Sequence, residues 1–164
     1  FNRIASIIVR RAIFLPALLD SMYVDFFSRN PLYYWSQSSI GFGIADRPFE
    51  LNPPAVIGLE FFGRSGMSAN TGYIGAGYAN AGIWGVAIYG IVIGVVISFL
   101  NEYGKLVGQP ILIALGFTLI MGAMRGSDLP TIFMTHGLIV LLLFVVVFPK
   151  SSDLDFKDMR ASYK

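Results

Sequence analysis

The amino-acid sequence predicts an all-α integral membrane protein, with about three transmembrane helices after an N-terminal, extracytoplasmic and partly interfacial helical segment. Hydrophobic residues make up 55% of the chain and charged residues only 13%, whereas a soluble domain carries about 25% charged residues. The mean hydropathy is +0.65. Residues 65–101, 106–124 and 129–149 contain no charged side chain. Each of these windows supplies close to the roughly 20 apolar residues that a helix needs to cross a bilayer.

Residues 1–80 are expected to form an extracytoplasmic or re-entrant region. The chain begins at Phe1, and Arg10 and Arg11 interrupt what would be the apolar core of a signal peptide. We therefore expect a C-terminal fragment of a longer polytopic protein. The stretch "IASIIVRRAIFLPALLDSMYVDFF" is apolar but carries arginines, which is typical of a helix at the membrane interface. The prolines of "RPFELNPPAVIG" predict extended backbone there, and residues 1–65 are expected to be largely irregular.

Three transmembrane helices are predicted at about 81–100, 109–125 and 129–149. In the first, Gly90 and Gly94 have the spacing that lets another helix approach closely. The turn "RGSDLP" offers Ser127 or Asp128 as the N-cap of the third helix, with Pro130 in its first turn. Residues 150–164 are too polar for another span and form a predicted cytoplasmic tail.

The basic residues of the short loops predict the orientation. Lysine occurs at 105, 150, 157 and 164, between the first two spans and after the third, so those regions are assigned to the cytoplasm. Residues 1–80 and the Arg125 turn then lie outside, where every basic residue is arginine. The planar guanidinium group of arginine matches phosphate and diphosphate oxygens. The other interpretation is that these arginines reach lipid headgroups or pair with nearby carboxylates.

Candidate chemistry is confined to a few residues. His136 is the only histidine and is a candidate general base, although a helix contact would equally satisfy its ring. Arg125 ends a short helix at the membrane edge, where ionisable residues are functional candidates. No phosphate-cradling loop, Gly-x-Ser-x-Gly elbow or His-Glu-x-x-His motif occurs in the chain. Neither a thiolate metal site nor a disulfide is possible without cysteine, and a net charge of +2 gives no argument for nucleic acid.

The stretches "RRAIFLPALLDSMYVDFFSRNPLYYWSQS", "IGLEFFGRSGMSANTGYIGAGYANAGIWGVAIYG" and "MRGSDLPTIFMTHGL" together resemble the bacterial oligosaccharide repeat-unit polymerases. These are the Wzy-type O-antigen and exopolysaccharide polymerases, and the resemblance covers about residues 5–145. It implies a GT-C-type glycosyltransferase of the bacterial inner membrane, acting on oligosaccharides linked to undecaprenyl diphosphate. The implied partners are that lipid-linked substrate, the bilayer, the remaining spans of the parent protein and a chain-length regulator. The resemblance implies no cofactor, metal or nucleotide sugar.

The resemblance also suggests roles for particular residues. Arg10 or Arg11, with Arg125 and Arg64, would bind the diphosphates. His136 and Asp128 would be the catalytic candidates. The sugar site would be formed by hydroxyl and amide groups of the "SANTGYIGAGYAN" segment, whose alternative interpretation is a close-packed helix without a ligand. Its candidate residues are Asn70, Thr71, Tyr73, Tyr78 and Asn80.

Two departures and two alternatives accompany this interpretation. The acidic residue that relatives often carry near Ala76 is absent, and the expected upstream spans are missing, so the fragment alone is expected to be inactive.

An O-antigen ligase-like transferase would use the same donor with a different acceptor. A lipid-linked oligosaccharide flippase or another transporter also places arginines and glycines around a polar path. Arginines gathered on one side favour chemistry at one interface over transport.

Overall fold

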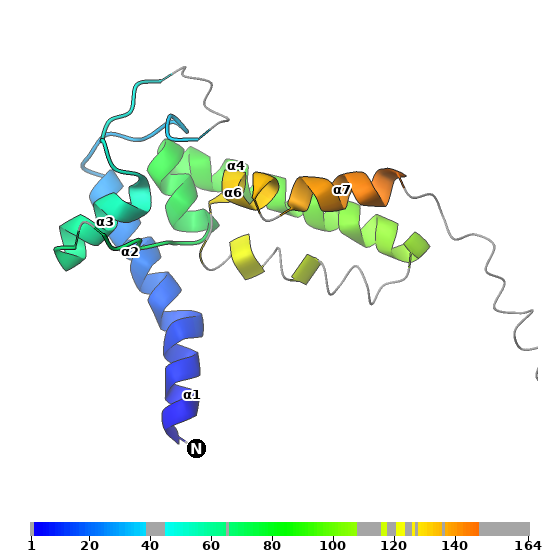
Figure 1. Cartoon of the computed structure of the whole chain (residues 1–164), viewed down its shortest axis with the longest axis horizontal. Coiled ribbons are helices and arrows are strands. Elements are labelled where there is room, and N and C mark those ends of the chain that lie inside the picture. The colour runs from blue at the N-terminus through cyan, green and yellow to red at the C-terminus, as the bar shows by residue number, and fades with distance from the viewer. Residues whose placement is uncertain are drawn as a thin grey trace, which may run out of the picture.

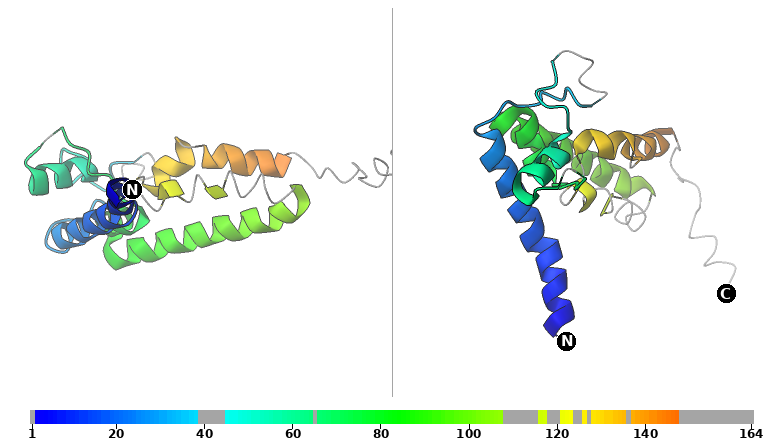
Figure 2. Two further views of the ribbon diagram at one scale, coloured as in Figure 1. Left: turned by 90° about the horizontal axis from the view of Figure 1, so that it is seen from below. Right: turned by 60° about the vertical axis from the view of Figure 1, so that its left-hand side comes forward.

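A computed structural model describes residues 2–38, 45–64, 66–107, 116–117, 121–123, 126, 128–135 and 137–147. Every regular element in these ranges is a helix, which confirms the all-α prediction. A long helical segment projects from one end of the molecule and crosses the direction of the longest helix, α4 (Figure 1). The loops and the shorter helix α3 gather at the crossing, and α6 and α7 follow α4 away from it (Figures 1 and 2).

The projecting segment is continuous from Asn2 to Phe27. It consists of α1 (Asn2–Val9), the wider π-helical turn η1 (Arg10–Phe14) and α2 (Leu15–Phe27). Pro16 explains η1, because proline lacks an N–H and its ring clashes with the carbonyl group four residues earlier. The wider turn accommodates the ring without breaking the helix. Residues 1–65 are thus more helical than the sequence predicted.

The prediction of extended backbone through "NPPAVIG" is wrong, because α3 (Pro53–Phe62) begins at the first of the paired prolines. Prolines are tolerated in the first helical turn, where an N–H has no intrahelical partner. Asn52 precedes them in extended conformation, and α3 ends at Gly63 in the left-handed conformation. The main core packs α2, α3 and the start of α4 together around the buried rings of Tyr23, Phe27 and Tyr33.

Two buried tyrosines of this core also make polar contacts. The Tyr23 hydroxyl donates to the carbonyl of Ala69 at 2.9 Å, and the Tyr33 hydroxyl donates to that of Leu51 at 2.6 Å. Burial raises the pKa of both hydroxyl groups above its usual range, so they remain protonated donors. Each bond fixes an irregular segment onto α2 or the loop after it.

Helix α4 (Tyr73–Val107) is the longest element and contains a sharp break at Ala81 and Gly82. Gly82 has φ 60° and ψ −143°, a combination that is essentially restricted to glycine. The break divides α4 into a first arm, residues 73–80, and a second arm, residues 83–107. The two arms approach each other so closely that a Cβ atom on Gly85 would lie 2.0 Å from the carbonyl oxygen of Gly77. Gly77, before the predicted span, and Gly85, within it, therefore form a backbone-to-backbone contact.

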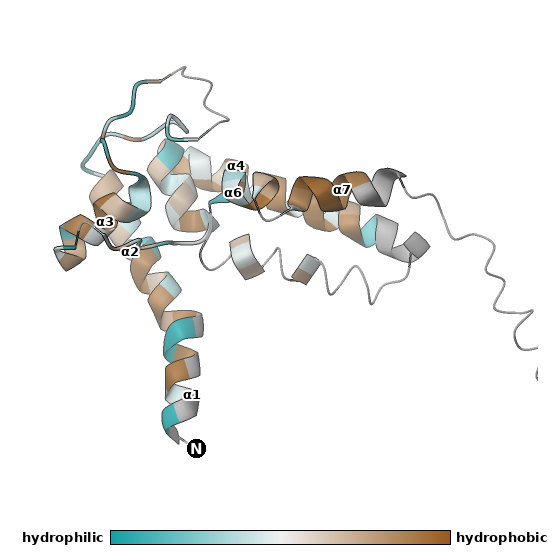
Figure 3. Ribbon diagram, viewed as in Figure 1, coloured by the Kyte–Doolittle hydropathy of each residue, from teal (hydrophilic) through white to brown (hydrophobic). Residues whose placement is uncertain are grey.

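Among the described residues, α4 is the one helix long and apolar enough to cross a membrane, from Tyr73 to Glu102. Its break lies where the sequence predicted a span to begin, at residue 81. Figure 3 shows apolar residues along α7 and much of the distal part of α4. Hydrophilic residues occur in the loops at the crossing end and as separate bands on the projecting segment. Only residues 116–117 and 121–123 of the predicted second span are described, and all five are helical.

The predicted third span differs from the structure because two helices replace one. Helix α6 (Leu129–Met134) ends at Thr135, and α7 (Leu138–Val147) follows after Gly137, which has a φ of 80°. This left-handed conformation favours glycine and redirects the chain. Both helices pack near Ile93 and Val96 of α4, through Ile132 of α6 and through Leu141 and Leu142 of α7.

Candidate functional site

A cleft of about 640 Å³ lies at the crossing end of the molecule, between α2, α3, the start of α4 and α6. Hydroxyl and amide side chains supply much of its wall, and Asp128 carries its one carboxyl group among the described residues. The polar lining residues are Gln37, Ser38, Asn52, Ser68, Asn70, Thr71, Asn80, Asp128, Thr131 and Thr135. Such a wall offers donors and acceptors for hydrogen bonds with little net charge.

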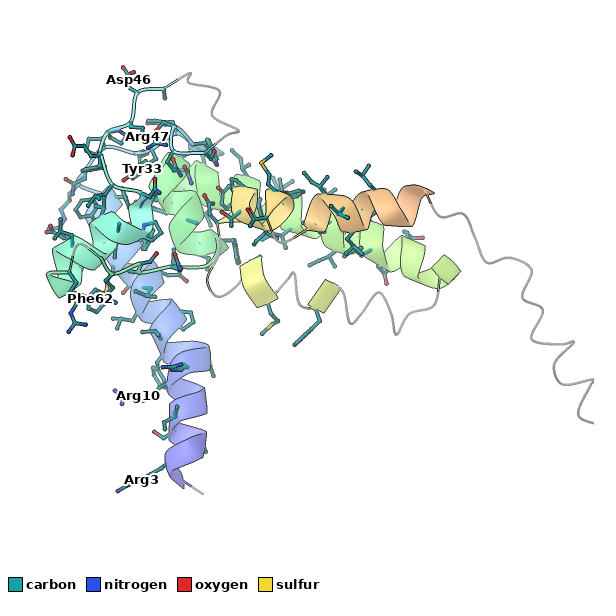
Figure 4. The ribbon with its side chains drawn as sticks, viewed as in Figure 1. Arg3, Arg10, Tyr33, Asp46, Arg47 and Phe62 are labelled. Atoms are coloured by element: carbon teal, nitrogen blue, oxygen red, sulfur yellow. The ribbon has the colours of Figure 1, made fainter. Side chains whose placement is uncertain are left out.

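The turn at residues 33–35, just before the cleft residues Gln37 and Ser38, pairs with the broken end of the first arm of α4. The backbone N–H groups of Tyr33 and Tyr34 donate at 2.9 Å to the carbonyls of Ala79 and Asn80, and the N–H of Trp35 donates at 3.0 Å to Asn80 Oδ1. Tyr34 and Trp35 have φ angles of 47° and 58°. With this backbone conformation, the three N–H groups point toward the end of the first arm of α4. Carbonyl groups freed by the break in α4 are thereby satisfied. Figure 4 shows Tyr33 at this junction.

Asn80 is 1% exposed and uses both ends of its amide within the protein. Its Oδ1 accepts from Trp35 and from Gln37 Nε2, while its Nδ2 donates to the Ala76 carbonyl at 2.8 Å and the Tyr89 hydroxyl at 3.3 Å. Gln37 is held there by Arg47, whose guanidinium donates to the carbonyls of Ser36 and Gln37. Gln37 Oε1 is buried and has no hydrogen-bond partner among the described residues.

The Tyr89 hydroxyl links this amide network to Asp128. It accepts from Trp35 Nε1 at 2.8 Å and from Asn80, and it donates to Asp128 Oδ1 at 2.7 Å. Two donors occupy the lone pairs of the hydroxyl, so its proton is directed at the carboxylate. The second arm of α4 therefore positions an acid that belongs to α6.

Asp128 occupies the N-cap position of α6, one of the two residues the sequence predicted there, but its side chain makes no capping bond. Burial raises the pKa of the Asp128 carboxyl above its usual range, while hydrogen bonds from Tyr89 and the backbone of Leu129 act in the opposite direction. A cleft carboxyl group with a raised pKa is suited to accept and return protons.

Asp20 stabilises the opposite wall from α2. One of its carboxylate oxygens accepts from the Thr71 hydroxyl and, at 3.0 Å, from the backbone N–H of Gly75. Gly75 lies in the first turn of α4, where N–H groups are unpaired and a negative charge is favourable. Thr71, only 3% exposed, is thereby fixed against the first turn of the helix.

The structure brings together part of the predicted site. Asn70, Thr71, Asn80 and Asp128 line the cleft, while Tyr73 and Tyr78 pack against hydrophobic clusters on either side of it. Arg10, Arg11 and Arg64 are exposed and do not line it. Arg125 and His136 lie outside the described residues, although Gly126, next to Arg125 in sequence, is part of the lining.

Sequence reasoning missed Asp20, Trp35, Gln37 and Tyr89. The one available signal was the hydroxyl of Tyr89 within an otherwise apolar helix, since a polar group at such a position needs a partner. Among the described residues, no group of three or more His, Cys, Asp or Glu side chains is arranged to hold a metal ion. The chain matches no family model, no curated protein and no solved structure. Function is therefore inferred from the cleft and its side chains.

Proposed function

We propose that the chain is the C-terminal portion of a membrane glycosyltransferase that polymerises undecaprenyl-diphosphate-linked oligosaccharide repeat units into O-antigen, capsule or exopolysaccharide. The observation that carries the proposal is the cleft, where a wall of hydroxyl and amide groups surrounds one carboxyl group of raised pKa. Neutral, hydroxyl-rich ligands such as oligosaccharides suit this lining, because each sugar hydroxyl both donates and accepts hydrogen bonds.

Membrane placement of α4 supports a lipid-linked substrate. From Ile83 to Glu102 the second arm is about 30 Å long at 1.5 Å per residue, close to the thickness of a bilayer core. Its exposed side chains include Ile83, Trp84, Ile91 and Val95. In the proposal, α4 and the two further spans expected from the sequence cross the bacterial inner membrane, and the cleft lies at its extracytoplasmic face.

In the proposed reaction, Asp128 accepts the proton of the acceptor sugar hydroxyl. The acceptor oxygen then bonds to the anomeric carbon of the donor sugar, as the bond from that carbon to the lipid diphosphate breaks. The leaving diphosphate requires fixed positive donors. Arg125 fills this role in the proposal, since its neighbour Gly126 lines the cleft and Arg10, Arg11 and Arg64 do not. His136 remains the alternative base suggested by the sequence.

Within the cleft, Asn70 and Gln37 are proposed to contact the sugar. Asn80 serves to hold Gln37 and the turn at 33–35, because its own amide is fully used. A cytoplasmic carboxyl terminus and a chain-length regulator as partner belong to the same proposal.

The test is the polysaccharide ladder made by cells that encode this chain, in its parent protein and with its own lipid-linked repeat unit. Asp128→Asn and Arg125→Ala are compared with Asp46→Asn, which removes an exposed carboxylate that does not line the cleft (Figure 4). We expect both cleft variants, expressed at control levels, to lose long chains while single-unit product is still made and repeat unit is still exported.

Other outcomes would contradict the polymerase proposal. An unchanged ladder in Asp128→Asn would remove Asp128 from the chemistry. Long chains that accumulate on the lipid carrier would indicate a ligase-like transferase. Repeat unit that stays on the cytoplasmic face would indicate a transporter.

A further inference from the structure

Residues 2–18 form an exposed helix with an apolar surface that the rest of the described chain does not cover. Ile7, Ile13, Phe14 and Leu18 are 58%, 63%, 65% and 48% exposed. Large contiguous apolar surfaces on proteins mark sites of protein or membrane contact. The segment extends away from the core, as the start of the chain in Figure 1 shows.

The same segment is positively charged. Arg3, Arg10 and Arg11 are exposed, and the first acidic residue of the chain is Asp20. Figure 4 shows Arg3 and Arg10 projecting from the same side of the helix. Within the part of the chain that the structure describes, no ion pair is found for these arginines. Apolar side chains beside such arginines complement an anionic lipid surface, whose phosphates lie just above the acyl chains.

The direction of the helix fits this surface. In the views of Figures 1 and 2, α1, η1 and α2 run across α4 rather than along it, at the end that carries the cleft. If α4 spans the bilayer, as the proposed function requires, the segment formed by α1, η1 and α2 lies near the plane of the membrane. The π-helical turn keeps it continuous past Pro16, so α2 can hold the exposed part in a fixed direction.

We propose that residues 2–18 are an in-plane anchor that docks on anionic phospholipid at the extracytoplasmic face. Its apolar side chains enter the boundary between headgroups and acyl chains, and Arg3, Arg10 and Arg11 bind lipid phosphates. The inference rests on the membrane placement in the proposed function but not on its chemistry. It gives Arg10 and Arg11, which do not line the cleft, a separate role.

Spin labels test the anchor directly, because a chain without cysteine accepts one label at a chosen position. The chain is reconstituted in nanodiscs of phosphatidylcholine, with or without phosphatidylglycerol, carrying a label at Ile7→Cys, Phe14→Cys or Ile91→Cys. Depth is measured from accessibility to oxygen and to a water-soluble nickel complex. With phosphatidylglycerol we expect the first two labels at one shared depth, about 5–10 Å below the headgroups.

Replacement of all three arginines by glutamine should lower the ratio of docked to undocked helix about fivefold per arginine in the anionic discs. Labels in water in both lipids, or equally deep in both, would overturn the anchor. Protection from both reagents would mean that protein covers the helix, which also overturns it. Depths differing by about 10 Å between positions 7 and 14 would mean a spanning helix. The label at Ile91 reports on α4 separately: if it is deep, only the anchor fails, and if it is in water, the membrane placement itself fails.

Discussion

The hydroxyl group of Tyr89 donates a 2.7 Å hydrogen bond to Asp128, which is 39 positions away in sequence. This contact joins a helix with a largely apolar surface to the only carboxyl group among the described cleft residues. It also places the indole of Trp35 and the amide of Asn80 in the same network, since both donate to the same oxygen. The position of the carboxyl group therefore depends on three separate parts of the chain.

Tyr89→Phe should alter both stability and the titration of Asp128. The substitution leaves Trp35 Nε1 and one Asn80 donor without their acceptor, at a cost of about 1–3 kcal/mol. Because the hydrogen bond from Tyr89 lowers the pKa of Asp128, its loss should raise that pKa further. If ionised Asp128 is the base, the acid limb of the activity profile moves to higher pH. Tyr34→Phe, at a side chain 56% exposed, is the control and should leave the profile in place.

Asp128→Asn should change how stability depends on pH. The folded pKa of Asp128 is raised above the usual 3.8, so the folded state binds its proton more tightly than the unfolded state. Stability from this group is therefore present at low pH and lost as pH rises from about 3.8 through the raised value. Thermal unfolding in detergent across that pH range should show a smaller loss of stability for Asp128→Asn than for the unmodified protein. If stability depended on pH identically in both proteins, burial would not perturb the pKa of Asp128.

Gly85→Ala should disrupt the break in α4. Its Cβ would lie 2.0 Å from the carbonyl oxygen of Gly77, a backbone atom that cannot move aside alone. We expect a loss of about 3 kcal/mol or more, on the scale of severe backbone overlap and overpacking. Gly90→Ala is the matched control, because nothing lies within 4 Å of its added atom. That variant should gain up to about 1 kcal/mol from helix propensity. Equal stability of the two variants would contradict the close contact.

Asp20→Ala should destabilise the start of α4 by about 1–2 kcal/mol, as for loss of a helix cap. Asp25→Ala on the same helix removes a carboxylate that pairs with Arg29 at the surface, where such pairs contribute less than about 1 kcal/mol. Hydrogen exchange at Gly75 separates the two, since only Asp20 accepts from its N–H. Unchanged exchange there in Asp20→Ala would exclude the capping role.

The sequence patterns predicted the helical class, because it follows from local composition. They predicted the start of a span near residue 81, but not that a helix would continue on both sides of a break there. The run of Gly and Asn before residue 81 reports a close backbone contact that needs small side chains. The interruption between α6 and α7 was missed because the apolar residues on both sides look continuous in sequence, although Gly137, directly before α7, has a positive φ. The helix at Pro53 was missed because paired prolines suit either an extended segment or a helix start.

The site was predicted in part for a related reason. Asn70, Thr71 and Asp128 line the cleft from segments whose polar residues stand out beside apolar helices. The contacts of Asp20 with Thr71 and of Trp35 with Tyr89 span 51 and 54 positions. No local pattern encodes such distances, and arginines on an exposed helix look the same in sequence as arginines in a cleft.

The pairing of the turn at 33–35 with Asn80 has a consequence for biosynthesis. The N–H of Trp35 finds its acceptor 45 residues later in the chain. At translation rates of about 5–20 residues per second, the turn leaves the ribosome several seconds before its partner does. During this interval three backbone amides and the aromatic rings beside them lack their final contacts. Nascent chains halted before residue 80 should therefore be held by chaperones and degraded quickly, and those halted after the break in α4 should survive.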